Sequence, residues 1–320
     1  TPRAWPIIGN FPRARFEASH LAREDGALTV ANTTNGIRTT VAIRLVDQES
    51  AAELWTVTLD NLTETSREVA VVPYLEWVLA RGLDDRFHTQ YARLFSEMEY
   101  VSHAHAILAW QKSTKTVGLL AADVAPAGFL TSRMDFIGRA RSIWKPRILE
   151  TLHFAAARDT AAHPTFDPIG SLTVHASLGP KVSRTLRFLI GSAANKALAL
   201  ELIAQHLKPQ APAHAPSGAA RETAHRAPRI GHGEIPPGTP QPYAEYIDQG
   251  KKLLVHTPYT PRPFDHAMSN AVGHSVMVTN RGLHTSCNGN SQQNRLTPDW
   301  PDTVTREVPS EAIYLYDPER

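Results

Sequence analysis

Short apolar runs that alternate with polar residues recur from residue 26 to residue 190. Successive side chains of a β-strand point to opposite faces, so this alternation predicts strands with one buried face. Asn35-Gly36 lies between two such runs and predicts a hairpin turn, because both central residues of that turn need positive φ. The expected strands are 26–32, 39–46, 54–59, 67–72, 74–79, 94–101, 106–110, 117–122, 170–178 and 184–190. Many short strands joined by turns predict an antiparallel β-sandwich.

Two prolines mark breaks in this pattern. Pro73 separates the runs 67–72 and 74–79, and a proline inside a run predicts an edge strand or a bulge. Helical spacing of apolar residues follows in 195–207, where Asn195 is the expected N-cap. Pro209 ends this short helix.

A proline-rich stretch, 208–242, divides the chain. It holds eight of the 24 prolines, with alanine, glycine and histidine filling most of the remainder. Such a segment buries too little apolar surface to offset its ordering entropy, so we expect an extended or disordered linker. Strands are expected again at 252–256, 275–279 and 312–316, too few for an independent sandwich. The predicted parts are 1–207, 208–242 and 243–320, and the sequence leaves open whether the two strand regions pack together.

Charge and motifs exclude several classes of protein. The net charge of +2 is much smaller than is typical of a nucleic-acid-binding protein. No run approaches about 18 apolar residues, so we expect no membrane contact from these residues. The motifs of nucleotide-binding loops, nucleophile elbows and zinc proteases are absent, and the 15 histidines show no metal-ligand spacing. We therefore expect neither a cofactor nor a metal, and the single Cys287 cannot form an intrachain disulfide.

Carboxylates and amides give three candidate sites. Glu97 and Glu99 share one face of a predicted strand, which suits either a general acid and base or a solvated strand face. The loop 288–298 concentrates side-chain amides and one guanidinium, planar groups that suit sugar hydroxyls or that satisfy the loop's own backbone. Trp300 between Asp299 and Asp302 suits a sugar subsite or an ordered turn.

Several motifs carry a resemblance to a known family. The stretch 290–298 (NSQQNRLTP), then Trp300 and Asp302, then 311–317 (EAIYLYD), resembles the opening of the β-supersandwich domain of glycoside hydrolase family 94. That family includes cellobiose-type phosphorylases and cyclic β-1,2-glucan synthases. The stretches 55–63, 72–79, 136–141 (FIGRAR) and 166–170 (FDPIG) resemble later parts of the same domain.

The resemblance implies a mainly β, galactose mutarotase-like supersandwich. Its motif order places the C-terminal part of one copy before the N-terminal part of a second, as in the tandem sandwiches of cyclic β-1,2-glucan synthases. The family's catalytic acid lies on an (α/α)₆ barrel that this chain does not contain, so no catalytic residue is assigned. The expected parent is a hexosyltransferase, synthase-like or phosphorylase-like, on the cytoplasmic side of a bacterial inner membrane.

The implied role is to bind and position β-glucan for glycosyl transfer in other domains of the same polypeptide. The candidate carbohydrate contacts share planar polar or aromatic groups and motif position: Gln292, Asn294, Arg295, Trp300, Asp302, Arg139 and Arg141. An alternative is a structural spacer that docks the catalytic barrel without touching sugar. A further alternative is a stand-alone glycosidase that uses Glu97 and Glu99.

Overall fold

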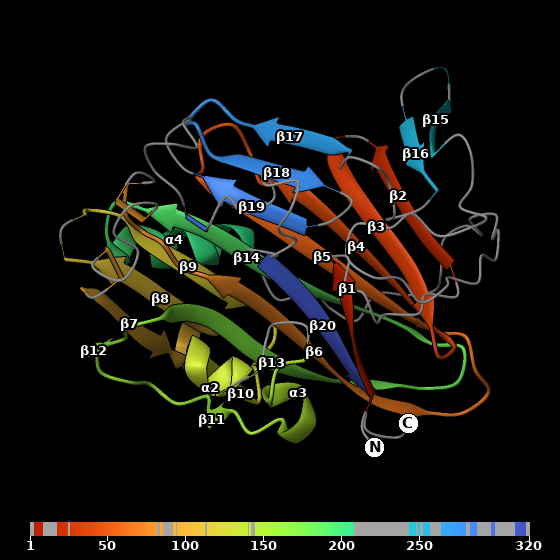
Figure 1. Cartoon of the computed structure of the whole chain (residues 1–320), viewed down its shortest axis with the longest axis horizontal. Helices are drawn as coiled ribbons and strands as arrows, with labels where there is room; N and C mark the ends of the chain where they lie inside the picture. Colours follow the sequence, from red (N-terminus) through yellow and green to blue (C-terminus); the bar gives the residue numbers. More distant parts are fainter. Residues whose placement is uncertain are drawn as a thin grey trace.

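The computed structural model places most of the chain in two packed antiparallel sheets (Figure 1). It describes residues 3–8, 18–24, 26–81, 84–85, 92–93, 95–112, 114–139, 141, 145–207, 243–247, 249, 252–256, 264–279, 282–286, 296–297 and 311–317. The predicted linker 208–242 lies outside the described residues. The predicted mainly β antiparallel sandwich is confirmed.

The first sheet, sheet A, contains strands from both ends of the chain. Its order is β11 (Ala155–Ala156), β10 (Gly128–Ser132), β13 (Pro168–Leu178), β6 (Arg67–Glu76), β20 (Glu311–Asp317), β19 (Gly282–Ser286), β18 (Ser275–Thr279) and β17 (Asp265–Ser269). β1 (Arg3–Ile8) also pairs with β20.

The second sheet, sheet B, holds most of the predicted N-terminal strands. Its order is β12 (His163–Pro164), β7 (Ser96–Val101), β8 (Ala106–Gln111), β9 (Val117–Ala122), β14 (Ser183–Ala193), β5 (Ala52–Asn61), β4 (Ile37–Leu45), β3 (Ala27–Thr34), β2 (Ala18–Glu24), β16 (Lys252–Val255) and β15 (Ala244–Ile247). The expected hairpin joins β3 to β4, with φ of 53° at Asn35 and 73° at Gly36.

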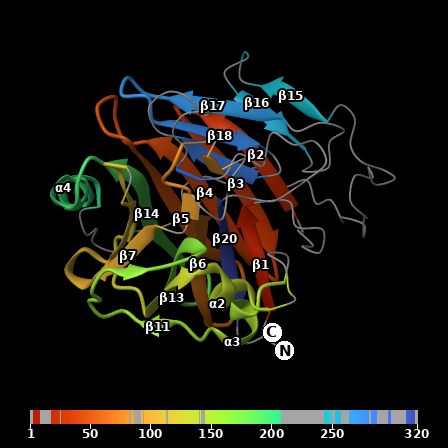
Figure 2. The same ribbon diagram turned by 60° about the vertical axis from the view of Figure 1, so that its left-hand side comes forward.

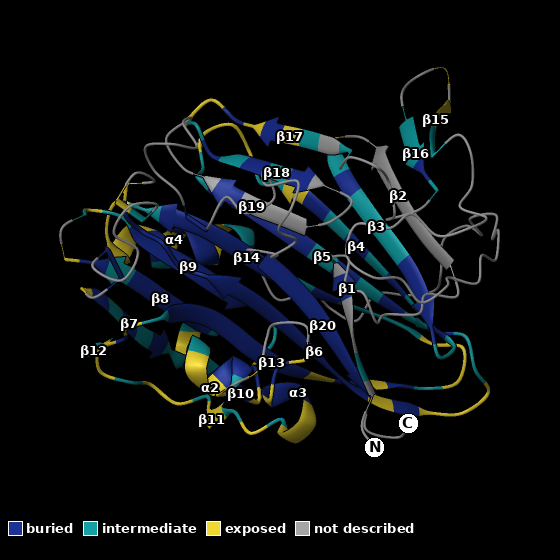
Figure 3. Ribbon diagram, in the orientation of Figure 1, coloured by how far each residue is buried: buried dark blue, intermediate teal, exposed yellow. Residues whose placement is uncertain are grey.

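Alternation along the strands of sheet B builds the core. In β5, Trp55, Val57 and Leu59 point inward and are fully buried, whereas Thr56 and Thr58 point outward and are half-buried. The inward side chains pack against those of sheet A, such as Val71 of β6. Strands β6, β13 and β20 are buried along most of their length, as Figure 3 shows. One continuous apolar layer therefore separates the sheets.

The prediction that Pro73 lies in an edge strand was wrong. Pro73 does not end a strand, since β6 runs through it and has neighbours on both sides, β13 and β20. The ladder between β6 and β13 is interrupted beside Pro73, between the pairs Ser171↔Tyr74 and Val174↔Val71. The Ser171 hydroxyl donates instead to the Pro73 carbonyl at 2.7 Å. A proline is tolerated in this central strand because the ladder there does not need its missing N–H.

Helices cover only part of the sandwich. The predicted helix is confirmed as α4 (Lys196–His206), where the Asn195 side chain accepts from the Leu198 N–H at 3.0 Å. Its apolar face packs on the outer face of sheet B, against Leu54 and Leu189 (Figure 2). Short elements not predicted from the sequence are η1 (Ser102–Ala104), α2 (Arg133–Ile137) and α3 (Ile148–Thr151). In the described part of the chain, no helix has the length and apolar character needed to cross a membrane.

The strands on the two sides of 208–242 join the same two sheets. β20 pairs with β6 from Glu311↔Leu75 to Tyr316↔Ala70, and β16 pairs with β2. A buried ion pair between Arg67 and Asp317 closes one end of the β6–β20 pair. The question left open by the sequence is thus answered, because the two strand regions pack together in the same two sheets.

A buried polar cluster also connects sheet A with sheet B. Glu53 of β5 and Glu311 of β20 are both fully buried, and their carboxyl groups interact. The Thr285 hydroxyl donates to Glu53 at 3.0 Å and the Thr297 hydroxyl donates to Glu311 at 2.8 Å. His274 places Nε2 3.4 Å from Glu53. We call these five residues the inter-sheet cluster.

Burial sets the protonation of the inter-sheet cluster. It raises the pKa of Glu53 to about 7, and burial together with the nearby Glu53 raises the pKa of Glu311 well above its usual range. Burial also lowers the pKa of His274 to about 4. The favoured state therefore has a neutral imidazole and at least one protonated carboxyl group.

The inter-sheet cluster predicts a pH-dependent stability. Its carboxyl groups bind protons more tightly in the folded chain, so their contribution is present below pH 4.5 and is lost as the pH rises through about 7. His274 acts in the opposite sense, but only below its ordinary pKa of 6.5. Above pH 6.5 we expect the free energy of unfolding to fall by about 1.4 kcal/mol per pH unit for each carboxyl group that is still protonated in the folded chain, so the contribution of Glu53 ends near pH 7 and that of Glu311 continues.

Glu311→Gln removes one of the titrating carboxyl groups. It should reduce the pH dependence of the free energy of unfolding, as measured by urea denaturation across this pH range. The matched control is Glu64→Gln, at a side chain that is 83% exposed. If the free energy of unfolding changes with pH as steeply in Glu311→Gln as in the control, the role of Glu311 in this pH dependence is contradicted.

Candidate functional site

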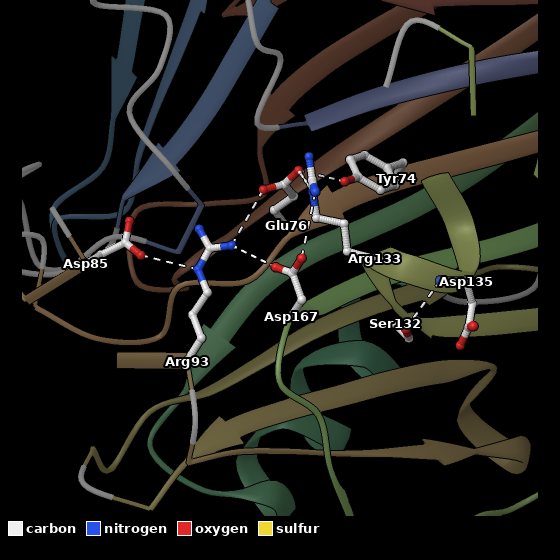
Figure 4. A network of polar contacts seen from close by, with 8 residues as sticks. All are labelled: Tyr74, Glu76, Asp85, Arg93, Ser132, Arg133, Asp135 and Asp167. Atoms are coloured by element: carbon white, nitrogen blue, oxygen red, sulfur yellow. Dashed lines mark hydrogen bonds and ion pairs between the residues drawn. The ribbon is translucent and has the colours of Figure 1, made fainter. Parts of the chain in front are cut away.

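A network of charged side chains gathers at the end of β6, as Figure 4 shows. Glu76 is the last residue of this strand, and Arg133 is the first residue of α2. Asp167 directly precedes β13, the neighbour of β6, and its carbonyl accepts from the Arg133 N–H at 3.0 Å. Arg93 and Asp85 come from the segment between β6 and β7. The sandwich thus brings together five charged residues that are far apart in the sequence.

Glu76 lies at the centre of this network. Its Oε1 accepts from the Tyr74 hydroxyl at 2.7 Å and from Arg133 Nε at 2.9 Å. Its Oε2 lies 3.8 Å from an Arg93 terminal nitrogen. Both guanidinium groups then reach Asp167, Arg93 at 3.0 Å and Arg133 at 3.7 Å. Two cations and two carboxylates therefore form a closed ring, which we call the Glu76 ring.

The Glu76 ring is buried on one side and open on the other. The exposed fractions are 6% for the Glu76 side chain and 9% for Arg93, but 35% for Arg133 and 40% for Asp167. The Nε of Arg93 lies 3.3 Å from Oδ1 of Asp85. The buried members hold the half-exposed pair in place, so Arg133 and Asp167 present fixed donors and acceptors to solvent.

The electrostatics keep both arginines charged. Burial disfavours the charged form of Arg133, but Glu76 and the other nearby anionic groups outweigh it and raise the pKa. The same balance raises the pKa of Arg93, where Asp85 contributes most among the carboxylates. Burial, and then the adjacent Glu76, raises the pKa of Tyr74, so its phenol remains a proton donor. Ordered charged groups of this kind suit the recognition of polar ligands.

Two predicted sugar-contact residues lie just after α2. Arg139 follows Gly138, whose φ of 87° turns the chain out of the helix, and its side chain is exposed. Arg141 is exposed as well, and its guanidinium lies 2.7 Å from Glu150 of α3. That contact raises the pKa of Arg141 and lowers the pKa of Glu150. Arg139 and Arg141 thus lie on the same segment as Arg133, at the surface.

The other five predicted contacts lie outside the described residues: Gln292, Asn294, Arg295, Trp300 and Asp302. The described residues between them are Leu296 and Thr297. The Leu296 carbonyl accepts from the Val78 N–H at 3.1 Å, two residues after Glu76. Leu296, the residue after Arg295, therefore lies next to the strand end that carries the Glu76 ring.

Glu97 and Glu99 point to the same face of β7, as predicted, but each carboxylate has its own ammonium partner. Glu97 lies 2.9 Å from Lys112, and Glu99 lies 2.7 Å from Lys196. The bond from Lys112 lowers the pKa of Glu97. A general acid needs a raised pKa, so this geometry favours the solvated strand face over the glycosidase alternative.

Sequence reasoning missed the Glu76 ring. One signal was available, because Tyr74 and Glu76 are polar residues in an otherwise apolar run and lie two residues apart, on one face of the strand. Nothing local connects them with Arg93, Arg133 or Asp167. Only the pairing of β6 with β13, and the position of α2 beside it, brings these side chains together.

Comparisons with known proteins give one match that covers most of the chain. Residues 12–209 and 251–320 match the family model described as glycosyl hydrolase 94, supersandwich domain. No curated protein sequence matches.

Two solved structures illustrate the structural likeness. One is described as a kojibiose phosphorylase from the human microbiome, with 7% identity, a TM-score of 0.32, and coverage of 63% of this chain and 28% of that one. The other is a polysaccharide lyase, with 9% identity, a TM-score of 0.31, and coverage of 59% and 27%. The chain thus spans little more than a quarter of either protein, and TM-scores of this size do not establish a shared fold.

Glu76→Gln tests the Glu76 ring as a structural unit. The substitution keeps the shape of the side chain but removes the anion that lies between the buried Arg93 and the half-exposed Arg133. We expect a loss of about 3 kcal/mol in the free energy of unfolding. Chemical denaturation followed by near-UV circular dichroism measures this loss, with the exposed Glu49→Gln as control. A loss of no more than about 0.5 kcal/mol, the usual range of a surface change, would contradict the role of the ring.

Proposed function

Because this chain belongs to the glycosyl hydrolase 94 family, as its supersandwich domain, we propose that it binds and positions a β-glucan chain. Glycosyl transfer itself then takes place in other domains of a longer polypeptide. In this proposal the parent enzyme resembles a cyclic β-1,2-glucan synthase or a glycoside phosphorylase. It carries a catalytic (α/α)₆ barrel and lies on the cytoplasmic side of a bacterial inner membrane.

The half-exposed pair of Arg133 and Asp167 is the observation that supports this proposal best. A sugar hydroxyl both donates and accepts a hydrogen bond, so a guanidinium beside a carboxylate suits two neighbouring hydroxyls. Both groups are already ordered by the buried Glu76 and Arg93, so less conformational entropy is lost on binding. An ordered pair at the surface of a carbohydrate-family domain suits a sugar contact better than a structural role alone.

The seven contacts predicted from the sequence remain part of the proposal. Arg139 and Arg141 supply guanidinium groups on the segment that follows Arg133. Arg295 directly precedes Leu296, whose carbonyl accepts from the Val78 N–H, and Trp300 follows shortly after in the sequence. The assignment of 1–207 and 243–320 to the end of one supersandwich and the start of the next also remains a prediction about the longer polypeptide.

Arg133→Lys tests the contact at the Glu76 ring. Lysine keeps the positive charge beside Glu76 but loses the planar pair of donors. We expect about tenfold weaker binding of β-1,2-linked gluco-oligosaccharides in calorimetric titration, with little change in thermal stability. Arg44→Lys on β4, an exposed arginine far along sheet B, is the control. Equal affinities for the wild type and Arg133→Lys would remove Arg133 from the proposed site.

A second experiment tests the predicted loop contacts in the full-length enzyme. Alanine at Arg295 and Trp300 should weaken glucan affinity and alter the length of the glucan product, because a chain held less firmly dissociates earlier. Unchanged affinity and product length in the double variant would exclude both residues. If the wild-type domain binds no glucan of any linkage while the enzyme remains active, the structural-spacer alternative is favoured.

A further inference from the structure

Two exposed phenylalanines lie at the β7–β12 end of sheet B. Phe166 is 77% exposed and Phe95 is 40% exposed. The register of β12 with β7 pairs His163 with Met98 and Pro164 with Glu97. The ladder continues one step further, since the Thr165 N–H donates to the Ser96 carbonyl at 3.0 Å. Continued one step beyond the strand ends, this register would set Phe166 opposite Phe95.

Burial shows that both rings lie on the outer face of the sheet. Along one strand Ser96 and Met98 are buried, whereas Phe95 and Glu97 are not. Along the other strand Thr165 is buried between the exposed Pro164 and Phe166. Directly opposed residues in an antiparallel pair share a face, so the two phenylalanines point outward together.

Polar groups surround the two rings. Lys112, whose N–H donates to the Phe95 carbonyl at 3.3 Å, is 64% exposed and contacts Glu97 at 2.9 Å. The Trp110 indole N–H donates to Glu97 at 3.2 Å. On the other side, Asp167 directly follows Phe166 and is the most exposed member of the Glu76 ring. Lys112, Glu97 and Trp110 thus place ordered hydrogen-bonding groups beside Phe95, and Asp167 is the neighbour of Phe166 in the chain.

We propose that Phe95 and Phe166 form an aromatic platform on which pyranose rings of a glucan chain stack. The apolar C–H face of a pyranose packs on an aromatic ring, while its equatorial hydroxyls point sideways. In this arrangement Lys112 and Glu97 reach hydroxyls on one side of the chain, and Asp167 and Arg133 reach those on the other. This inference rests on the proposed function and names an additional contact surface for the same ligand.

The composition of the platform favours a carbohydrate over a protein partner. Specific protein interfaces bury about 800 Å² on each side around an apolar centre. Here two aromatic side chains are bordered closely by charged groups, which leaves too little continuous apolar surface for such a centre. A neutral, hydroxyl-rich chain uses both kinds of group at once, because stacking leaves its hydroxyls free for the polar border.

Phe166→Ala tests the platform. The probes are β-1,2-linked and β-1,4-linked gluco-oligosaccharides, titrated by calorimetry into the whole 320-residue chain. Losing one stacking ring should weaken binding about tenfold. Phe166→Trp, which restores a ring, should bind at least as tightly as the wild type. The matched control is Val182→Ala, which truncates a 48% exposed apolar side chain in the β13–β14 turn. Thermal unfolding of each variant checks that the fold is intact.

The outcomes separate the two proposals. If the wild type binds glucan and Phe166→Ala binds within about twofold of the Val182→Ala control, the platform is overturned and the proposed function stands. If Phe166→Ala weakens binding and Phe166→Trp fails to restore it, stacking is likewise overturned, because a ring of either type should serve. If the wild type binds neither probe, the proposed function fails for this chain, and the platform fails with it.

Discussion

The fold depends on the meeting of two carboxyl groups inside an apolar sandwich. Glu53 comes from sheet B and Glu311 from sheet A, and two threonine hydroxyls fix their outer oxygens. A buried pair of carboxyl groups is tolerated only when at least one is neutral and the remaining oxygens are hydrogen-bonded. The hydrogen bond from Thr285 of β19 to Glu53 of β5 joins facing strands of the two sheets. The cluster therefore specifies how the late strands dock, which a purely apolar layer would specify less sharply.

Local patterns predicted many of the elements but missed the strands β1, β2, β10, β17 and β19, and long-range pairing could not be predicted from them. The runs 117–122 and 275–279 have the bounds of β9 and β18, and Asn195 caps α4 as expected. Alternation reports which face of a strand is buried and says nothing about which strand lies beside it. The insertion of β20 next to β6 was therefore missed, and so was the position of Pro73 within a central strand. The Glu76 ring was missed for the same reason, because its members become neighbours only through that pairing.

The Glu76 ring and the platform show how one sandwich corner combines rigidity with access. The buried half of the ring, Glu76 and Arg93, is part of the packed interior. Its open half, Arg133 and Asp167, shares the surface with Phe166. Charged groups at a surface usually lose side-chain entropy when they bind a ligand. Here that entropy is lost during folding, so the corner is ordered before any ligand arrives.

The position of β20 also has a consequence for the order of synthesis. β6 and β13 are made early and can pair at once, but the other edge of β6 accepts a strand that lies more than two hundred residues later. During translation this apolar edge stays unpaired, and unpaired edges invite association with other chains. Pairing over such a sequence distance is slow once the strand emerges. The free edge of β6 therefore remains open to other chains until β20 has been made.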